Sequence, residues 1–239
     1  MALAFRAYEY WLLGYRRRWR GSVVSSLLNP VLYLTALGVS YVAYVAPAML
    51  AALGMQIAAF ESAWPVMAAI RWTRVYHAML ATQLRVRDIL AGQLLYVLTR
   101  VGIASGIYLV VLSAFGALKS PWAILAWPTT ILIGLAFGAP IAALGAAAKK
   151  DSAFSAVFRF VITPLFLFSG TFFPVTRLPV GLRLVAYATP LWHGVDLCRR
   201  LTLGDVSLGI CLVHVAYLAA FAAVGVWLAL RSYTKALVS

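Results

Sequence analysis

The run from Gly21 to Ala69 contains a single charged residue, Glu61, and this run constrains the fold more than any other feature of the chain. As a helix it would be about 70 Å long at 1.5 Å per residue, whereas one crossing of a bilayer needs about 20 residues. Two crossings must therefore fit within 22–69, and we predict them near 22–40 and 46–69. The intervening GVSYVAYVAP has too little polar character for an external loop. We therefore predict that residues are missing from this chain near Gly38–Tyr41.

Further apolar runs, each long enough to cross a bilayer, follow along the remaining chain. The sequence is 64% hydrophobic and 11% charged, whereas a soluble domain is about half apolar and a quarter charged. We predict an all-α polytopic membrane protein with one domain over 1–239 and six transmembrane helices. The four later spans are predicted within 94–147 (near 94–117 and 123–147), at 152–170 and at 207–230.

The basic residues indicate a membrane topology rather than a nucleic-acid groove. The net charge is +14, but the cations cluster at the ends of the apolar runs, as topology signals do. At the N-terminus, large side chains recur every three or four residues, which predicts an amphipathic interface helix over 2–20 with its arginines toward anionic lipid. The side chains on its apolar face are Phe5, Tyr8, Leu12, Tyr15 and Trp19.

The distribution of charge also predicts which segments lie on the same side. Fifteen of the 20 Lys and Arg residues fall on one side if the two termini, segment 71–93 with the nearby Arg100, and the link 149–151 with the nearby Arg159 share it. Cytoplasmic loops carry the excess of Lys and Arg, so this side is predicted to be cytoplasmic. Segment 171–204 is then external. Its prolines and glycines prevent a continuous helix, and its apolar residues favour short re-entrant helices between spans five and six.

Glu61 and Arg100 fall within predicted spans, where an unpaired charge is costly. We predict that they form an ion pair that fixes the register of two helices. The alternative is that Glu61 belongs to a substrate or proton path.

Motifs for catalysis and metal binding are absent from the sequence. There is no G-x-x-x-x-G-K-[ST] for a nucleotide, and the three histidines have no metal-ligand spacing. Cys198 and Cys211 form no C-x-x-C pair. His193 and Asp196 could share a helical face, but the adjacent Trp192 favours an interfacial anchor over a catalytic pair. We therefore predict no catalytic residue, no metal and no enzymatic activity in this chain itself.

Three stretches carry a resemblance to a known family: APAMLAALGMQIAAFES at 46–62, ATQLRVRDILAGQLLY at 81–96 and FSGTFFPVTRLPVGLRLVAYATPLWHGVDLCR at 168–199. With them the chain resembles the membrane subunit of type-2 ABC exporters, and it looks like the nodulation-factor and drug exporter permeases among them. The resemblance covers nearly the whole chain. The near-absent loop after the first span departs from the family pattern.

The resemblance implies a permease of an ATP-driven exporter for an amphipathic or hydrophobic substrate, such as a drug or a glycolipid-like molecule. ATP and Mg would be bound by a partner, a dimer of ABC ATPase subunits. A second permease, identical or paralogous, membrane lipid and a bacterial inner-membrane location are also implied, and nucleic acid is not. An ion-gradient-driven secondary transporter and a non-catalytic membrane scaffold remain alternatives.

The resemblance also implies roles for particular residues. Segment 71–93 would form a cytoplasmic coupling helix, and its expected contacts with the ATPase are Tyr76, His77, Thr82, Arg85 and Asp88. The external segment would act as an outer gate, or alternatively as a cap that only seals the bundle. The expected gate residues are Phe172, Phe173, Pro174, Leu191 and Trp192.

Overall fold

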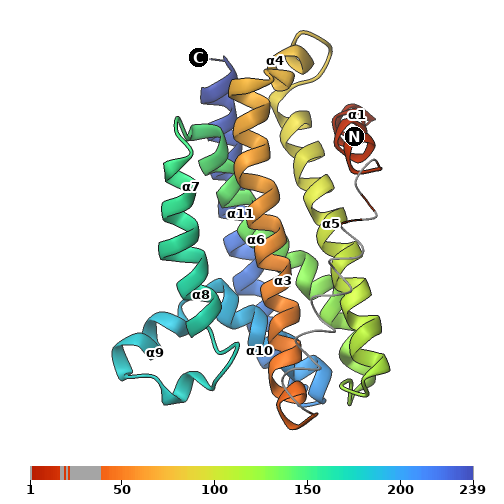
Figure 1. Ribbon diagram of the computed structural model, residues 1–239, viewed down its shortest axis with the longest axis vertical. Helices are drawn as coiled ribbons and strands as arrows, with labels where there is room; N and C mark the ends of the chain where they lie inside the picture. Colours follow the sequence, from red (N-terminus) through yellow and green to blue (C-terminus); the bar gives the residue numbers. More distant parts are fainter. Residues whose placement is uncertain (1, 17–18, 20, 22–38, 239) are drawn as a thin grey trace.

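The computed structural model describes residues 2–16, 19, 21 and 39–238, and within these ranges every regular element is a helix (Figure 1). The long helices are α3 (Val39–Met67), α5 (Val86–Ala114), α6 (Ala126–Ala147) and α11 (Leu208–Val238). The remaining elements are α1 (Ala2–Arg16), η1 (Ala68–Trp72), α4 (Val75–Leu80), η2 (Pro121–Leu125), α7 (Ser152–Val157), η3 (Phe158–Ile162), α8 (Thr163–Phe168), η4 (Val175–Arg177), α9 (Val180–Tyr187) and α10 (Pro190–Leu203).

Four helical stretches in the described part of the chain are long and apolar enough to cross a membrane, namely Tyr44–Trp72, Val86–Ala114, Pro121–Ala147 and Leu208–Val238. They correspond to four of the six predicted spans. The helix that corresponds to the third predicted span, α5, begins at Val86 rather than near 94. The predicted coupling segment is therefore shorter than expected. Ser152–Phe168 is apolar but shorter than these spans. Residues 22–38 of the predicted first span lie outside the described residues, and 39–40 belong to α3. The missing residues near Gly38–Tyr41 stay a prediction.

Helix ends are set by local sequence. At the start of η2 the Ser120 hydroxyl accepts a hydrogen bond from the Trp122 N–H at 3.2 Å, with Pro121 between them. Thr189 does the same for α10, whose first residue is again proline. Such caps satisfy N–H groups that have no partner inside the helix, and proline at the first position has none to satisfy. Gly204, at φ +93°, then ends α10.

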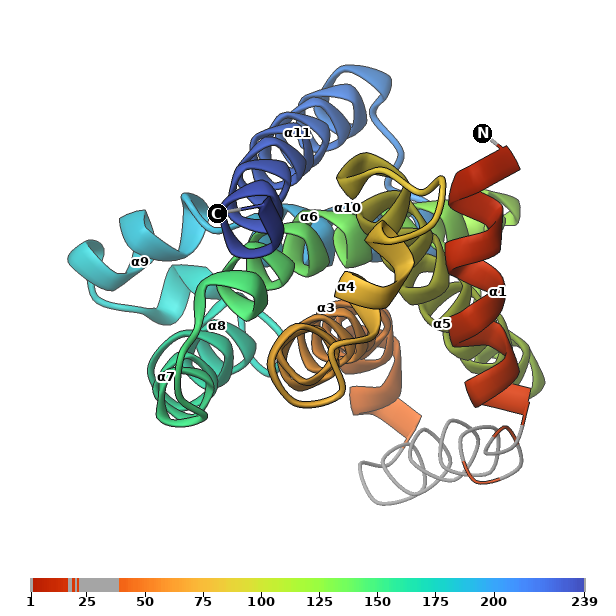
Figure 2. The same cartoon turned by 90° about the horizontal axis from the view of Figure 1, so that it is seen from above.

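Small residues let the long helices approach closely. A Cβ added at Gly54 of α3 would lie 2.7 Å from the Thr130 side chain of α6, and one at Gly225 of α11 would lie 2.6 Å from Pro140. Gly145 of α6 faces the Ser62 carbonyl at 2.7 Å in the same way. Close backbone packing of this kind stabilises helices in lipid, where the hydrophobic effect between helices is weak. Helix α6 is therefore the centre of the bundle, between α3 and α11 (Figure 2).

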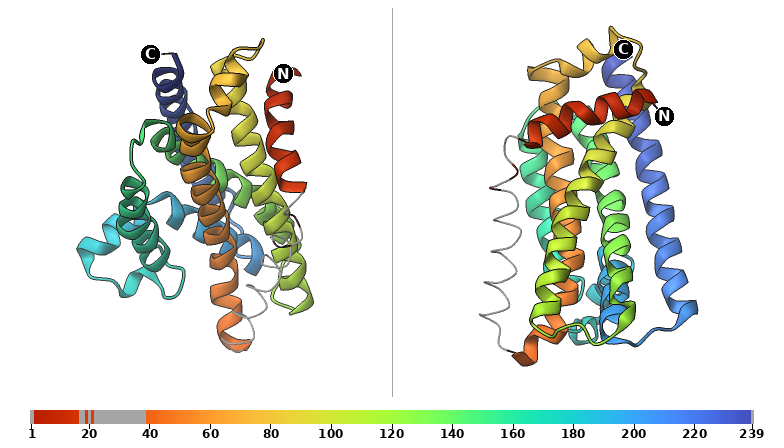
Figure 3. Two further views of the ribbon diagram at one scale, coloured as in Figure 1. Left: turned by 45° about the horizontal axis from the view of Figure 1, so that its top comes forward. Right: turned by 90° about the vertical axis from the view of Figure 1, so that its right-hand side faces the viewer.

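The two ends of the bundle differ. Both termini and α4 lie at one end, whereas α9, α10 and the start of α3 lie at the other (Figure 1). Helix α1 runs across the bundle rather than along it (Figure 3), and a Cβ at Gly92 of α5 would lie 2.6 Å from the Ala7 side chain. The grouping of the N-terminus, the 71–93 segment and the C-terminus at one end is the arrangement that the charge pattern predicts.

Candidate functional site

Glu61 of α3 and Arg100 of α5 form an ion pair between two of the spans. Their side chains approach to 3.3 Å, with 17% and 18% of each exposed. The Arg100 guanidinium also lies over the Tyr15 ring of α1, 4.5 Å from its centre. The structure therefore brings the two predicted residues together and adds a third element, α1, to their contact.

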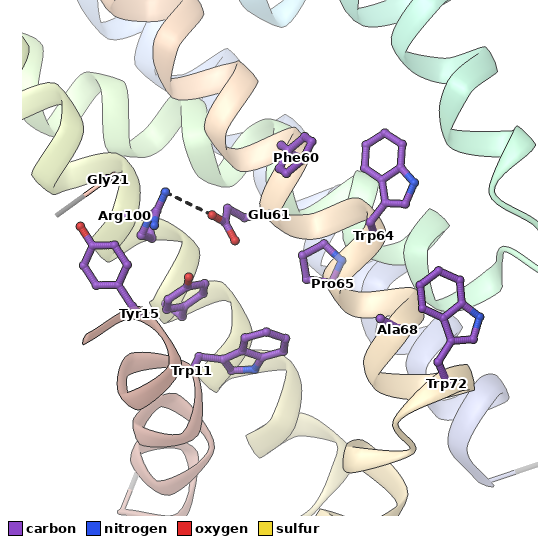
Figure 4. A pocket seen from close by; sticks show the side chains of 11 residues that line it. Trp11, Tyr15, Gly21, Phe60, Glu61, Trp64, Pro65, Ala68, Trp72 and Arg100 are labelled. Atoms are coloured by element: carbon purple, nitrogen blue, oxygen red, sulfur yellow. Dashed lines mark ion pairs between the residues drawn. The ribbon is translucent and has the colours of Figure 1, made fainter. Parts of the chain in front are cut away.

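A cavity of about 620 Å³ opens beside this pair (Figure 4). Trp11 and Tyr15 of α1 line one side, and α3 and its π-helical extension line the other. The full lining is Trp11, Tyr15, Gly21, Phe60, Glu61, Trp64, Pro65, Ala68, Trp72, Tyr96 and Arg100. An aromatic wall with one ion pair suits a ligand that has both apolar and polar parts. The sequence did not predict this cavity, because its aromatic residues come from separate elements.

The predicted ATPase-contact residues cluster around α4. His77, Thr82 and Arg85 are exposed or partly exposed, and so is Asp88. The Arg85 N–H donates to the Asp88 carboxylate at 3.0 Å, which caps α5. These four side chains lie where a partner could reach them.

The prediction is corrected at Tyr76. This side chain is fully buried, packs edge-on against Trp11 and donates to the Gln93 amide oxygen at 3.3 Å. It therefore supports α4 from within and offers no surface to a partner. Burial raises the pKa of Tyr76, so the hydroxyl stays protonated and remains a donor.

The predicted outer-gate residues separate into two groups. Phe172 and Phe173 are half-buried and Pro174 is exposed, in the turn before η4. Leu191 is fully buried in the main core with Val195 and Cys198, so it holds α10 in place and is not free to line a passage. Trp192 packs edge-on against Tyr187, His193 and His214.

A polar network that the sequence did not predict joins α10 to α11. The Nδ1 atoms of His193 and His214 lie 2.7 Å apart, and His214 Nε2 contacts Asp196 at 3.0 Å. Asp196 also accepts from Arg200 at 2.6 Å. Burial lowers the pKa of His193 to about 4, assisted by the neighbouring His214. Burial by itself would raise the pKa of Asp196, but the hydrogen bonds from His214 and Arg200 prevail and hold it at about 2.

Arg199 of α10 connects the turn at Gly170 to the first part of α3. Its guanidinium donates to the Gly170 carbonyl at 2.9 Å and to the Tyr44 carbonyl at 3.3 Å, and it lies over the Tyr44 ring at 3.9 Å. Gly170 itself has φ +83°, which a side chain rarely tolerates. Among the described residues no group of three or more His, Cys, Asp or Glu side chains could hold a metal ion.

Comparison with known proteins identifies the family. The family model described as "ABC-2 type transporter" matches residues 9–203, most of the chain. The chain belongs to this family. It is therefore an ABC-2 type permease, a multi-pass membrane protein.

Several curated relatives are similar over most of this permease. Nodulation protein J of Rhizobium leguminosarum bv. trifolii is 32% identical, covering 84% of each chain. That of Rhizobium meliloti (strain 1021) is 30% identical over 90% of this chain and 88% of its own. Nodulation protein J of Sinorhizobium fredii (strain NBRC 101917 / NGR234) is 27% identical over 96% and 94%. That last alignment spans 248 positions, more than the 239 residues of this permease, so the relative has residues without a counterpart here.

Proposed function

We propose that this permease is the membrane subunit of an ATP-driven exporter that moves an amphipathic substrate outward across the bacterial inner membrane. The family match over residues 9–203 carries the proposal. The aromatic cavity beside Glu61 and Arg100 supports the substrate class, because it offers both apolar walls and one charged pair. The relatives are named nodulation proteins, and we infer a glycolipid-like substrate for this permease.

The energy would come from a separate ATPase subunit that binds ATP and Mg. We infer that its dimer docks on the side chains around α4, with His77, Thr82 and Arg85 in the contact. Closure of that dimer on ATP would displace α4 and favour an outward-facing state over an inward-facing one, as a two-state shift biased by differential binding. The excess of Lys and Arg at this end favours a cytoplasmic location for both termini.

A second permease, identical or paralogous, would complete the exporter. The segment from η3 to α9 exposes large apolar side chains such as Phe160, Leu182 and Val185, which suit lipid or a second permease subunit. The external segment from η4 to α10 would close the outer end of the passage, and its alternative role is a cap that seals the bundle.

Reconstitution tests the proposal. Purification in mild detergent should recover an ABC ATPase with this permease, and the complex in liposomes should hydrolyse ATP in a vanadate-sensitive manner. A fluorescent lipid-linked oligosaccharide, used as the probe, should be exported only when ATP is present. Transport driven by a proton gradient without ATP would favour the secondary-transporter alternative. Assembly without any transport would favour the scaffold.

A further inference from the structure

Pro65 leaves one carbonyl of α3 without its helical partner. In an α-helix the N–H of residue 65 would donate to the carbonyl of residue 61, but proline has no N–H. The Glu61 carbonyl therefore needs another donor, because an unsatisfied backbone group inside a membrane costs several kcal/mol. Pro65 lies in the last turn of α3, directly before the π-helix η1.

Gln93 of α5 supplies that donor. Its Nε2 atom lies 3.0 Å from the Glu61 carbonyl oxygen, and the side chain is fully buried. The other end of the same amide, Oε1, accepts from the Tyr76 hydroxyl of α4 at 3.3 Å. One side-chain amide thus joins α3, α4 and α5 beside Pro65.

The covalent route between α3 and α4 is irregular. Residues Ala68–Trp72 form a π-helix, and Arg74, at φ +50°, is the one non-glycine residue with positive φ among the described residues. Short π-helices are frequent at functional sites, and residues with strained backbone cluster at ligand clamps and switch regions. Pro65, the π-helix and Arg74 all lie in or beside the short connection between α3 and α4.

We propose that Gln93 is a positioning residue that links the position of α4 to the backbone of α3 at Pro65, and so to the Glu61–Arg100 pair. This inference rests on the proposed function, since it takes the displacement of α4 to come from the ATPase. When α4 moves, the Tyr76 hydroxyl shifts the Gln93 amide. The hydrogen bond from Gln93 to the Glu61 carbonyl then becomes weaker or changes direction. The path of α3 changes there, and with it the side of the aromatic cavity that α3 forms.

The test must separate this link from a purely structural role. Gln93→Leu alone would remove the Gln93 partner of both the Glu61 carbonyl and the Tyr76 hydroxyl in the interior, a loss that can destabilise the fold. The triple variant Pro65→Ala/Tyr76→Phe/Gln93→Leu avoids this, because alanine in place of Pro65 restores the helical N–H and the other two changes remove the remaining polar groups. Tyr76→Phe alone removes the hydrogen bond from α4 to Gln93 and keeps the donation from Gln93 to the Glu61 carbonyl. Tyr108→Phe, which removes a buried hydroxyl without a hydrogen-bond partner in the described residues, is the matched control.

The readout is the accessibility of the cavity in the complex with its ATPase. A cysteine introduced at the exposed Phe60, in a Cys211→Ala background, is labelled with a maleimide before and after trapping with vanadate. The trapped state should change the labelling rate in the unaltered and Tyr108→Phe proteins. In Tyr76→Phe and the triple variant this change should shrink about three- to tenfold, the scale of one buried hydrogen bond, while assembly and ATP hydrolysis persist.

Two results would overturn the inference, and they are distinguishable. An undiminished vanadate-dependent change in both Tyr76→Phe and the triple variant would remove the role of Gln93 and leave the exporter intact. Absence of an ATPase, or of any vanadate-dependent change in the unaltered protein, would overturn the proposed function together with the role of Gln93.

Discussion

The imidazoles of His193 and His214 face each other with their Nδ1 atoms 2.7 Å apart, so one ring donates and the other accepts. They come from α10 and α11, and the Tyr217 ring stacks on His193 with centres 3.9 Å apart. Asp196 and Arg200 extend the contact from the other side of His214. The pair therefore holds α10 against α11, and both rings are buried in this contact.

The first prediction is a loss of stability on acidification. The pKa of His193 is lowered from 6.5 to about 4 in the folded protein, so between these values the unfolded chain binds a proton that the folded one does not. Stability should therefore fall as the pH decreases through this range. Asp196, with a pKa of about 2 against an ordinary 3.8, extends the loss to lower pH. Thermal unfolding in detergent at a series of pH values measures both.

His193→Gln provides the comparison for this prediction. Glutamine can still donate to His214 but does not titrate, so the decrease of the unfolding temperature between about pH 6.5 and about pH 4 should become smaller. His77→Gln, on the exposed side of α4, is the control and should keep the full pH dependence. An unaltered pH profile in His193→Gln would refute the assignment.

The second prediction concerns the Glu61–Arg100 pair. Glu61→Gln leaves a mostly buried guanidinium without its carboxylate, and we expect a loss of about 1–3 kcal/mol in stability. Replacing both residues by glutamine should cost less than the two single losses together, because the unpaired charge disappears. Denaturation of the purified permease gives the double-mutant cycle. Loss of transport in Glu61→Gln with assembly and ATPase activity intact would instead support a substrate or proton path.

The third prediction separates coupling from folding at the start of α5. Arg85→Glu reverses an exposed charge at the end where we propose that the ATPase docks, but keeps the backbone N–H that binds Asp88. It should reduce ATP-dependent transport while leaving the unfolding temperature nearly unchanged. Asp88→Ala removes the cap and should cost about 0.5–2 kcal/mol. If Arg85→Glu transports as fast as the unaltered protein and co-purifies with the ATPase to the same extent, the partner contact lies elsewhere.

The fourth prediction distinguishes an outer gate from a cap. Leu191→Ala creates a cavity in the main core and should cost about 2–5 kcal/mol of stability. Phe172→Ala and Phe173→Ala remove half-buried side chains in the turn before η4 and should cost less. If the segment gates the passage, these two variants change the transport rate at normal assembly. If it only caps the bundle, transport follows the amount of folded protein.

Two predicted residue roles show where sequence patterns stop being informative. Tyr76 and Leu191 both lie in segments whose function the resemblance suggested, but the sequence could not say which side chains of α4 and α10 face outward. A long amphipathic helix gives a clear periodicity, whereas α4 has only six residues. Burial of Tyr76 and Leu191 is decided by neighbours from other helices, α1 and α5 for Tyr76 and the main core for Leu191.

The sequence by itself determined the helical class, the sites of four spans and the grouping of the basic segments at one end, because length, apolarity and charge act through local rules. It also predicted the ion pair of Glu61 and Arg100, because a charge inside an apolar run needs a partner. Only the tertiary structure decided that Gln93 satisfies the carbonyl freed by Pro65 and that His193 meets His214. Gln93 and Glu61 are 32 positions apart in the sequence, and the two histidines are 21 positions apart. Helical periodicity does not predict contacts between residues so far apart in the sequence. Their contacts arise from the way the helices pack, which depends on the small residues that let α3, α5, α6, α10 and α11 come close.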